Sequence, residues 1–418
     1  MSNPTILRDR ACTACGCLCD DIVVTVEDGA VSGSENLCQL GEQWLRTGLL
    51  TPDHQIDGRA ASRDEAFAEA ASILSRAKAP LVYGLGGLDV DGVRAATELA
   101  EQLGAVIAPE CSVLEKAATA ALQTVGASTA TLGEIRHRAD TVVLWRADPF
   151  SEQPRFWERF IEPSGMAIPG GRPERDIWCV DDGKSNTATL SDHHRTLAPA
   201  EDLRAVWQLR AEVEGIDAKQ QSNGAHDEFF RLLAGRLKQS RYSAFVLGRG
   251  IAGASHPRAV VDGLSRLVRS LNADTRSVLV TLPAAGGLPA LQWASGAAGP
   301  VDYSSGTPKA LIEVSGGREL LLSRAVDVAL LVGDGGLESL TAQERDALAE
   351  TPTIVVGGAS SWTGFEPRVR LGTLTPGITA EGQAFRADGL ALPLRRMLQP
   401  SGAAPAEALR LLQAALAR

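Results

Sequence analysis

The sequence predicts an α/β protein in which a small N-terminal cysteine-rich module precedes two Rossmann-like domains, each built on a parallel β-sheet. Three observations carry this prediction. Five of the seven cysteines lie within the first 38 residues. Short apolar runs alternate with helical patterns along the rest of the chain, which is the order of a parallel sheet covered by helices on both faces. The length of 418 residues exceeds one ordinary core and favours two or three domains.

The bulk composition excludes several classes of protein. Hydrophobic residues make up 44% of the chain and charged residues 22%, as in soluble globular proteins. A formal net charge of −10 disfavours nucleic acid and an anionic membrane surface as partners. No apolar run reaches the roughly 20 residues needed to span a bilayer, and residues 1–10 lack the apolar core of a signal peptide. We therefore expect a cytoplasmic protein whose cysteines bind metal.

The N-terminal cysteines have the spacing C-x2-C-x3-C-x18-C, formed by Cys12, Cys15, Cys19 and Cys38. Short loops bring the first three sulfurs together, and a hairpin-like stretch at 22–29 returns the fourth. Soft thiolate sets of this kind select iron–sulfur clusters or zinc. The alternative is a set of buried or disulfide-paired cysteines, against which the density and spacing argue. Cys17 falls outside the ligand spacing, and its neighbours allow it to exchange with Cys15 or Cys19.

The remaining elements follow from apolar periodicity and capping signals. Turn-forming residues at 50–53 mark a boundary, and capping boxes at 62–65 and 341–344 open helices. An exposed loop is expected at 215–223. The predicted strands are 80–84, 105–108, 141–145, 176–180, 242–247, 277–282, 326–332, 353–356 and 369–371, and helices are expected at 93–103, 114–122, 264–271 and from 405 onward.

Two glycine-rich turns follow predicted strands. Gly84, Gly86 and Gly87 end the first strand of the α/β region, and residues 248–253 form a complete G-x-G-x-x-G that includes Gly250. Glycine loops at helix N-termini bind phosphate groups. A standard NAD site is disfavoured because the next strand ends at 281–282 without an acidic residue for the ribose. The alternative is a tight strand-to-helix turn that needs small residues.

The six histidines form neither H-x-H nor H-E-x-x-H, which argues against a metallohydrolase within this chain. His193 and His194 are adjacent, so their side chains diverge, and we expect them on the surface or on a cleft wall. Cys179 lies at the end of an apolar strand and is interpreted as a core residue.

The run from Cys12 to Ile22, with Cys38-Gln39-Leu40-Gly41 after it, resembles the cluster-binding segment of the molybdopterin oxidoreductase superfamily. Within that superfamily it resembles the B subunits of formylmethanofuran dehydrogenases, especially the form in the formyltransferase/hydrolase complex of methylotrophic bacteria. The resemblance implies that the cysteine set holds a four-iron four-sulfur cluster, with zinc or an empty site as alternatives. It implies that a retained pterin dinucleotide would contact the phosphate-binding glycines Gly84, Gly86, Gly87, Gly248 and Gly250.

The same resemblance implies a domain order in which the second α/β unit is inserted into the first. We expect the cysteine module at 1–54, the first domain at 55–150 and 301–418, and the inserted domain at 151–300. The superfamily's usual C-terminal β-barrel is expected to be absent from this chain. The expected partners are subunits of the A, C and D types, which together move a formyl group between carriers and release formate.

One position departs from the family pattern. Catalytic members bind tungsten or molybdenum through a cysteine, and counting back from residues 121–126 places that ligand at Leu114. Cys111 lies three residues upstream, a span of roughly 10 Å when extended, and would serve only after a loop shift; otherwise it is a small buried residue. The sequence therefore predicts a scaffold subunit in one-carbon metabolism (formaldehyde to formate) that has lost redox activity. The alternatives are an active dehydrogenase subunit with tungsto- or molybdopterin, and an interaction module that holds zinc or nothing.

Overall fold

The computed structural model describes residues 3–50, 52–183, 185–216, 228–282, 287–297, 299–311, 317–333, 340–358 and 365–417. Most of the loop expected at 215–223 lies outside these residues. The chain forms two compact units. The first comprises Met1–Cys111, Ala285–Arg386 and Ala391–Arg418, and the second comprises Ser112–Ala284 and Ala387–Leu390.

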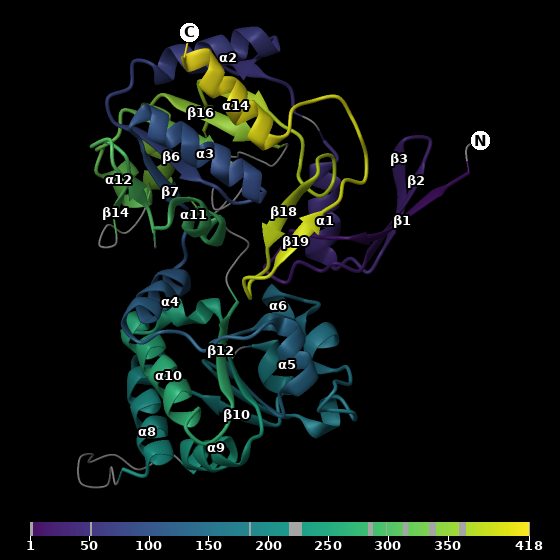
Figure 1. Ribbon diagram of the computed structural model, residues 1–418, viewed down its shortest axis with the longest axis vertical. Coiled ribbons are helices and arrows are strands. Elements are labelled where there is room, and N and C mark those ends of the chain that lie inside the picture. The colour runs from purple at the N-terminus through teal and green to yellow at the C-terminus, as the bar shows by residue number, and fades with distance from the viewer. Residues whose placement is uncertain are drawn as a thin grey trace. The chain divides into compact units, whose positions relative to one another are not determined.

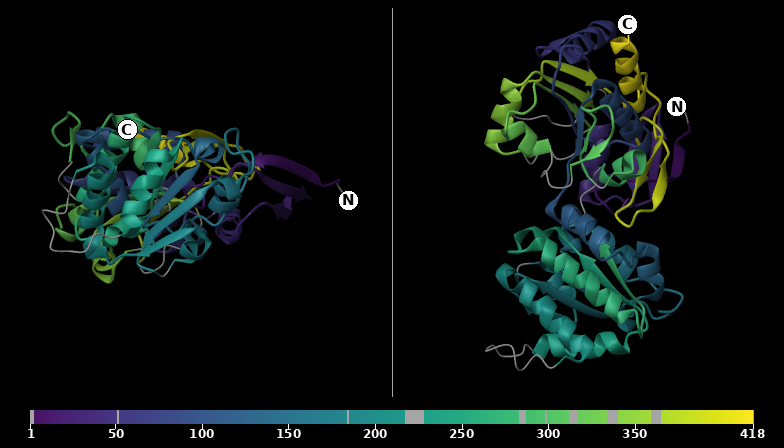
Figure 2. Two further views of the ribbon diagram at one scale, coloured as in Figure 1. Left: turned by 90° about the horizontal axis from the view of Figure 1, so that it is seen from below. Right: turned by 60° about the vertical axis from the view of Figure 1, so that its left-hand side comes forward.

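The N-terminal module is a small antiparallel sheet followed by a helix. Strand β2 (Ile22–Glu27) pairs with β1 (Thr5–Arg10) on one side and with β3 (Ala30–Glu35) on the other. Helix α1 (Gln39–Gly48) follows. Figure 2 shows these strands as a ribbon separate from the larger sheets. The hairpin predicted at 22–29 is thus confirmed, and the long cysteine-rich loop lies between β1 and β2.

The first unit is built on a mixed sheet with a parallel centre, whose order is β14-β13-β7-β6-β15-β16-β17-β4-β5. When the parallel strands are numbered by their appearance in the chain, they lie side by side in the order 2-1-3-4-5. This is a doubly wound arrangement, and the order reverses between β6 and β15. The strands are β4 (Gln55–Ile56), β5 (Arg59–Ala60), β6 (Pro80–Gly84), β7 (Val106–Pro109), β13 (Val301–Asp302), β14 (Lys309–Ala310), β15 (Val328–Val332), β16 (Thr353–Gly357) and β17 (Val369–Gly372).

Helices cover both faces of this sheet, so its strands are apolar on both sides. Along β6, Val82 faces the core shared with α2, α3 and α14, whereas Leu81 and Tyr83 face the core on the side of α12 and α13. Figure 1 shows α2, α3 and α14 together on one side. The helices are α2 (Arg63–Leu74), α3 (Val90–Leu103), α11 (Leu288–Ser295), α12 (Gly317–Leu322), α13 (Ala342–Glu350) and α14 (Pro405–Leu416), and a hairpin of β18 (Gly382–Phe385) and β19 (Ala391–Leu394) lies beyond the sheet.

The second unit is built on a parallel sheet in the order β10-β9-β8-β11-β12. This is the 3-2-1-4-5 order of chain appearance, and it reverses between β8 and β11. The elements are β8 (Thr141–Trp145), β9 (Asp176–Asp181), β10 (His193–Thr196), β11 (Ser243–Leu247) and β12 (Ser277–Thr281), with α4 (Val113–Thr124), α5 (Leu132–Arg138), α6 (Pro149–Glu152), α7 (Asn186–Leu190), α8 (Asp202–Glu214), α9 (Glu228–Gln239) and α10 (Pro257–Leu271).

The predicted fold class is confirmed: a cysteine module and two parallel α/β units. The predicted boundary at residue 150 needs correction, because β8 is the central strand of the second sheet and the second unit begins at Ser112 and runs to Ala284. An apolar run looks the same whichever sheet it joins, so only strand pairing reveals the boundary. Among the described residues, no helix combines the length and apolarity required to cross a bilayer.

Candidate functional site

The predicted cysteine ligands lie in one loop and at the start of one helix. The loop between β1 and β2 is closed by a hydrogen bond from the Cys12 amide to the Cys19 carbonyl at 2.9 Å. Inside it, the Leu18 amide donates to the Cys15 carbonyl at 3.3 Å, and Leu18 adopts a positive φ of 42°. This tight turn folds back the short segment that carries Cys12, Cys15 and Cys19.

The fourth cysteine reaches the loop because α1 approaches it closely. Cys38 is the N-cap of α1, and its carbonyl accepts the Glu42 amide at 2.9 Å. Gly41 lies in the first turn, where a β-carbon would stand 2.8 Å from the Leu37 side chain and 3.3 Å from the Cys12 sulfur. The missing side chain therefore lets the helix N-terminus, which favours negative charge, lie against the thiols.

Electrostatics links the predicted ligands to one another. Burial, and after it the neighbouring thiols of Cys19, Cys15 and Cys38, raise the pKa of the Cys12 thiol. The three neighbours are the other members of the predicted set. Because a cysteine binds metal as the thiolate, metal binding by this set would release the thiol proton of Cys12. The donor set therefore fits a thiolate-bound iron–sulfur cluster or zinc.

The first glycine turn lies where the order of its sheet reverses. Gly84 ends β6 with φ at 111°, and Gly87 has φ at 74°. Open α/β sheets bind ligands at such a point, beyond the carboxyl ends of the strands. A small cavity of about 40 Å³ is lined by Gly87 together with Thr13 and Cys15. The structure thus brings the cysteine loop and the first glycine turn to the same small cavity.

The second glycine turn occupies the corresponding point of the second sheet, after β11. A β-carbon on Gly248 would clash with the Ala147 backbone, and one on Gly250 would lie 2.8 Å from the Arg146 carbonyl. Both glycines are therefore required by close backbone packing against the segment that follows β8. The alternative interpretation of this motif, a tight turn, has a direct structural basis here.

The position expected for the metal ligand is filled by hydrophobic core. Leu114 is fully buried in the first turn of α4 and belongs to the core of the second unit. A capping box between Ser112 and Glu115 fixes the start of this helix. Cys111 lies two residues beyond the carboxyl end of β7 and is partly exposed, so the interpretation as a buried core residue is corrected.

Replacing Leu114 by alanine is expected to destabilise the second unit by about 2–5 kcal/mol, because the change leaves a cavity in a packed core. Urea unfolding measures the loss. The matched control is Leu122→Ala in the same helix, where the side chain is 54% exposed and the expected change is within about 0.5 kcal/mol. Equal losses for the two variants would contradict the structural role assigned to Leu114.

A polar cluster that the sequence did not reveal lies at the carboxyl ends of β6 and β7. Glu110 accepts hydrogen bonds from the Tyr83 hydroxyl and from Arg318, whose guanidinium lies 2.6 Å from the carboxylate. Arg318 also pairs with buried Glu344 at 3.4 Å. Because these residues are far apart in the chain, no local pattern predicts their meeting.

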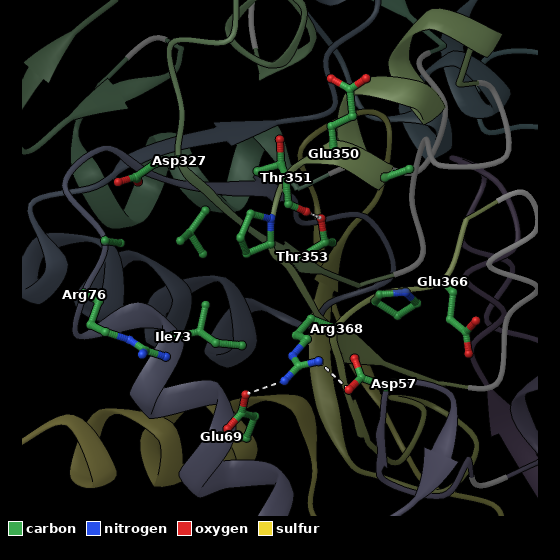
Figure 3. Close-up of a pocket in the computed structure, with 15 residues that line it drawn as sticks. Asp57, Glu69, Ile73, Arg76, Asp327, Glu350, Thr351, Thr353, Glu366 and Arg368 are labelled. Carbon is green, nitrogen blue, oxygen red and sulfur yellow. Dashed lines mark hydrogen bonds and ion pairs between the residues drawn. The ribbon is translucent and has the colours of Figure 1, made fainter.

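The pocket drawn in Figure 3 lies at the opposite edge of the first sheet. It has a volume of about 670 Å³, and Asp327, Thr351 and Arg368 on its wall come just before β15, β16 and β17. Arg368 pairs with Asp57 and, at 3.3 Å, with Glu69 (Figure 3). Because parallel sheets bind ligands at the carboxyl ends of their strands, this pocket is not the cofactor position of the fold.

Two solved structures share the fold of this chain. The structure matches the formyltransferase/hydrolase complex from Methylorubrum extorquens with a TM-score of 0.71 at 24% identity, over 87% of this chain and 98% of that one. It matches acetylene hydratase from Pelobacter acetylenicus with a TM-score of 0.66 at 11% identity, over 98% of this chain and 69% of that one. The chain thus shares its fold with these two proteins.

Sequence relatives are more specific than the shared fold, because all of them are B subunits. The chain is 26% identical to the B subunit of tungsten-containing formylmethanofuran dehydrogenase 2 from Methanocaldococcus jannaschii, over 94% of both chains, and equally similar to that of Methanococcus maripaludis, over 95% of both. It is 30% identical to the B subunit of the formyltransferase/hydrolase complex from Methylorubrum extorquens, over 54% of this chain and 58% of the relative. No family model matches. The chain is a relative of formylmethanofuran dehydrogenase B subunits along almost its whole length, which confirms the predicted resemblance.

Proposed function

We propose that this chain is a structural subunit of a formyltransferase/hydrolase complex in one-carbon metabolism, derived from a dehydrogenase subunit whose redox reaction has been lost. The sequence relatives are B subunits of formylmethanofuran dehydrogenase and of such a complex, which supports a place beside partners of the A, C and D types. Those partners would carry the acyl transfer between a tetrahydromethanopterin carrier and a furan carrier, and the hydrolysis that releases formate.

The single observation that carries this proposal is the burial of Leu114 at the position counted for the metal ligand. Tungsten or molybdenum held by pterin dithiolenes needs a soft or anionic protein ligand. The side chain of Leu114 supplies no such atom, and it packs in the core of the second unit. The residues at this position do not fit a catalytic metal, so no redox step is assigned to it.

The N-terminal cysteine module differs from the position of Leu114, because its sulfur donors fit a metal ion or an iron–sulfur cluster. Cys12, Cys15, Cys19 and Cys38 would hold a four-iron four-sulfur cluster, with zinc as the alternative. A cluster would supply electron transfer and zinc would only cross-link the loop to α1. In a scaffold subunit either group would fix the N-terminal module against the β18–β19 hairpin, whose Leu394 packs on Leu18.

A second candidate function is that of an active dehydrogenase subunit, and one observation favours it. Cys111 is partly exposed just beyond the carboxyl end of β7, the edge at which ligands of such sheets bind. The relatives that match over most of the chain are named tungsten-containing enzymes. In this alternative Cys111 would take the place of the missing ligand.

Elemental analysis of the purified complex for tungsten and molybdenum, combined with Cys111→Ser, separates the two functions. The scaffold proposal expects neither metal and unchanged formate release in the variant. Tungsten or molybdenum near one per chain, lost in Cys111→Ser but kept in the matched thiol variant Cys17→Ser, would overturn it in favour of the dehydrogenase. Iron or zinc in the same sample reports only on the cysteine module.

A further inference from the structure

A second cluster of metal-binding side chains lies in the second unit, away from the N-terminal cysteines. It consists of Cys179 and Asp181 on β9 and His194 on β10. Each residue offers one ligand atom, and these sulfur, oxygen and nitrogen atoms all lie within 4.8 Å of one another. Among the described residues it is the one group of three or more such side chains that meets this spacing.

Strand register explains why these residues meet. Cys179 and Asp181 are two positions apart on β9, so their side chains point to the same face of the sheet. His194 lies directly opposite Cys179 in the parallel pairing of β9 with β10. The neighbouring His193 points to the other face, where its ring stacks on Trp178 at 3.9 Å between centroids. The two adjacent histidines therefore have separate roles.

The separation of Cys179 and Asp181 is that of two ligands of a tetrahedral ion, whereas His194 and Asp181 are as close as a hydrogen bond allows. The Cys179 sulfur is 3.5 Å from one Asp181 carboxylate oxygen, and the His194 Nε2 is 2.8 Å from the other. Zinc bonds of about 2.3 Å to sulfur and 2.0 Å to oxygen, opened to a tetrahedral angle, separate the two ligand atoms by roughly 3.5 Å. The Cys179–Asp181 pair already has this separation.

The surroundings also fit a metal site. The Gly183 amide donates to Asp181 at 2.6 Å, and the Ser185 hydroxyl donates to the same carboxylate, so two hydrogen bonds fix its orientation. Cys179 is fully buried, whereas the His194 side chain is 29% exposed. The group is therefore accessible to an ion from the histidine side.

We propose that Cys179, Asp181 and His194 bind one divalent metal ion of the zinc class. A thiolate, a carboxylate and an imidazole form a borderline-soft donor set of the kind that zinc accepts. Binding replaces the thiol proton of Cys179 by the ion, and no electrons are transferred. The ion ties β10, which is the edge strand of its sheet, to β9 and to the turn that carries Ser185. This inference does not depend on the proposed function.

Titration of the purified, reduced, chelator-treated full chain with Co²⁺ tests the site. The readouts are the thiolate-to-cobalt charge-transfer absorbance and the number of equivalents bound in competition with a chromophoric chelator. The N-terminal cysteines would also bind Co²⁺, so the quantity of interest is the difference between variants. His194→Gln removes the imidazole while its amide can keep the hydrogen bond to Asp181, and the exposed position preserves folding.

We expect the wild-type chain to bind one equivalent more than His194→Gln and Cys179→Ser. The matched control His193→Gln removes the neighbouring histidine on the other face and is expected to bind as the wild type does. Zinc should raise the melting temperature of the wild type and of this control more than that of His194→Gln. Equal stoichiometry in wild type and His194→Gln would overturn the proposal and leave the three residues as a hydrogen-bonded network.

Discussion

Cys38→Ser is expected to abolish metal binding by the N-terminal module. In the proposed site four thiolates would share one cluster or ion, and an Fe–S or zinc site that loses one of them generally cannot hold its group. Cys38 is also the residue that connects the loop to α1, because it caps that helix while its thiol acts on Cys12. The measurement is iron and zinc content of the purified protein together with its visible absorbance, which a cluster gives and zinc does not.

The matched control for this prediction is Cys17→Ser. Cys17 lies in the same loop and is 1% exposed, but it falls outside the predicted ligand spacing. Metal content should therefore stay at the wild-type level. If Cys17→Ser lost metal and Cys38→Ser kept it, the ligand set inferred from the spacing would be wrong.

Asp202→Ala should destabilise the second unit by about 3–5 kcal/mol, because removing the carboxylate leaves the charge of Arg146 buried without its ionic partner. The Asp202 carboxylate lies 3.0 Å from the Arg146 guanidinium, and their side chains are 0% and 3% exposed. The Trp145 indole donates to the same carboxylate at 2.9 Å. Arg146 also supports the second glycine turn, because its carbonyl accepts the Gly250 amide at 3.1 Å. Urea unfolding followed by tryptophan fluorescence measures the effect.

An exposed ion pair at the start of α8, the helix that begins at Asp202, is the matched control. Arg204 lies 3.6 Å from Glu201, with side chains 60% and 46% exposed. Such pairs contribute about 0–1 kcal/mol, so Arg204→Ala should leave the unfolding midpoint almost unchanged. A loss for Asp202→Ala no larger than that for Arg204→Ala would show that the buried pair does not hold β8 and α8 together.

Local patterns in the sequence predicted most of the secondary structure. Strands β6 and β8 have the predicted bounds, and the capping boxes at Ser62 and Thr341 are present. Both features are local: an apolar run of five residues between turn signals is a buried strand, and a serine or threonine three residues before glutamate caps a helix. The cysteine ligand set is also predicted from spacing, because short loops restrict where neighbouring sulfurs can lie, and it stays a prediction.

The sequence by itself predicted the fold class, the parallel strands of both sheets except β10, and the candidate thiol ligands. Only the tertiary structure decided which sheet each strand joins, and therefore that β8 belongs to the second unit and that each glycine turn lies where its own sheet reverses order. It also decided that Leu114 is core and that Cys179 meets His194 across two strands. The physical reason is that strand pairing and side-chain packing join residues far apart in the chain, whereas periodicity and capping report only on near neighbours.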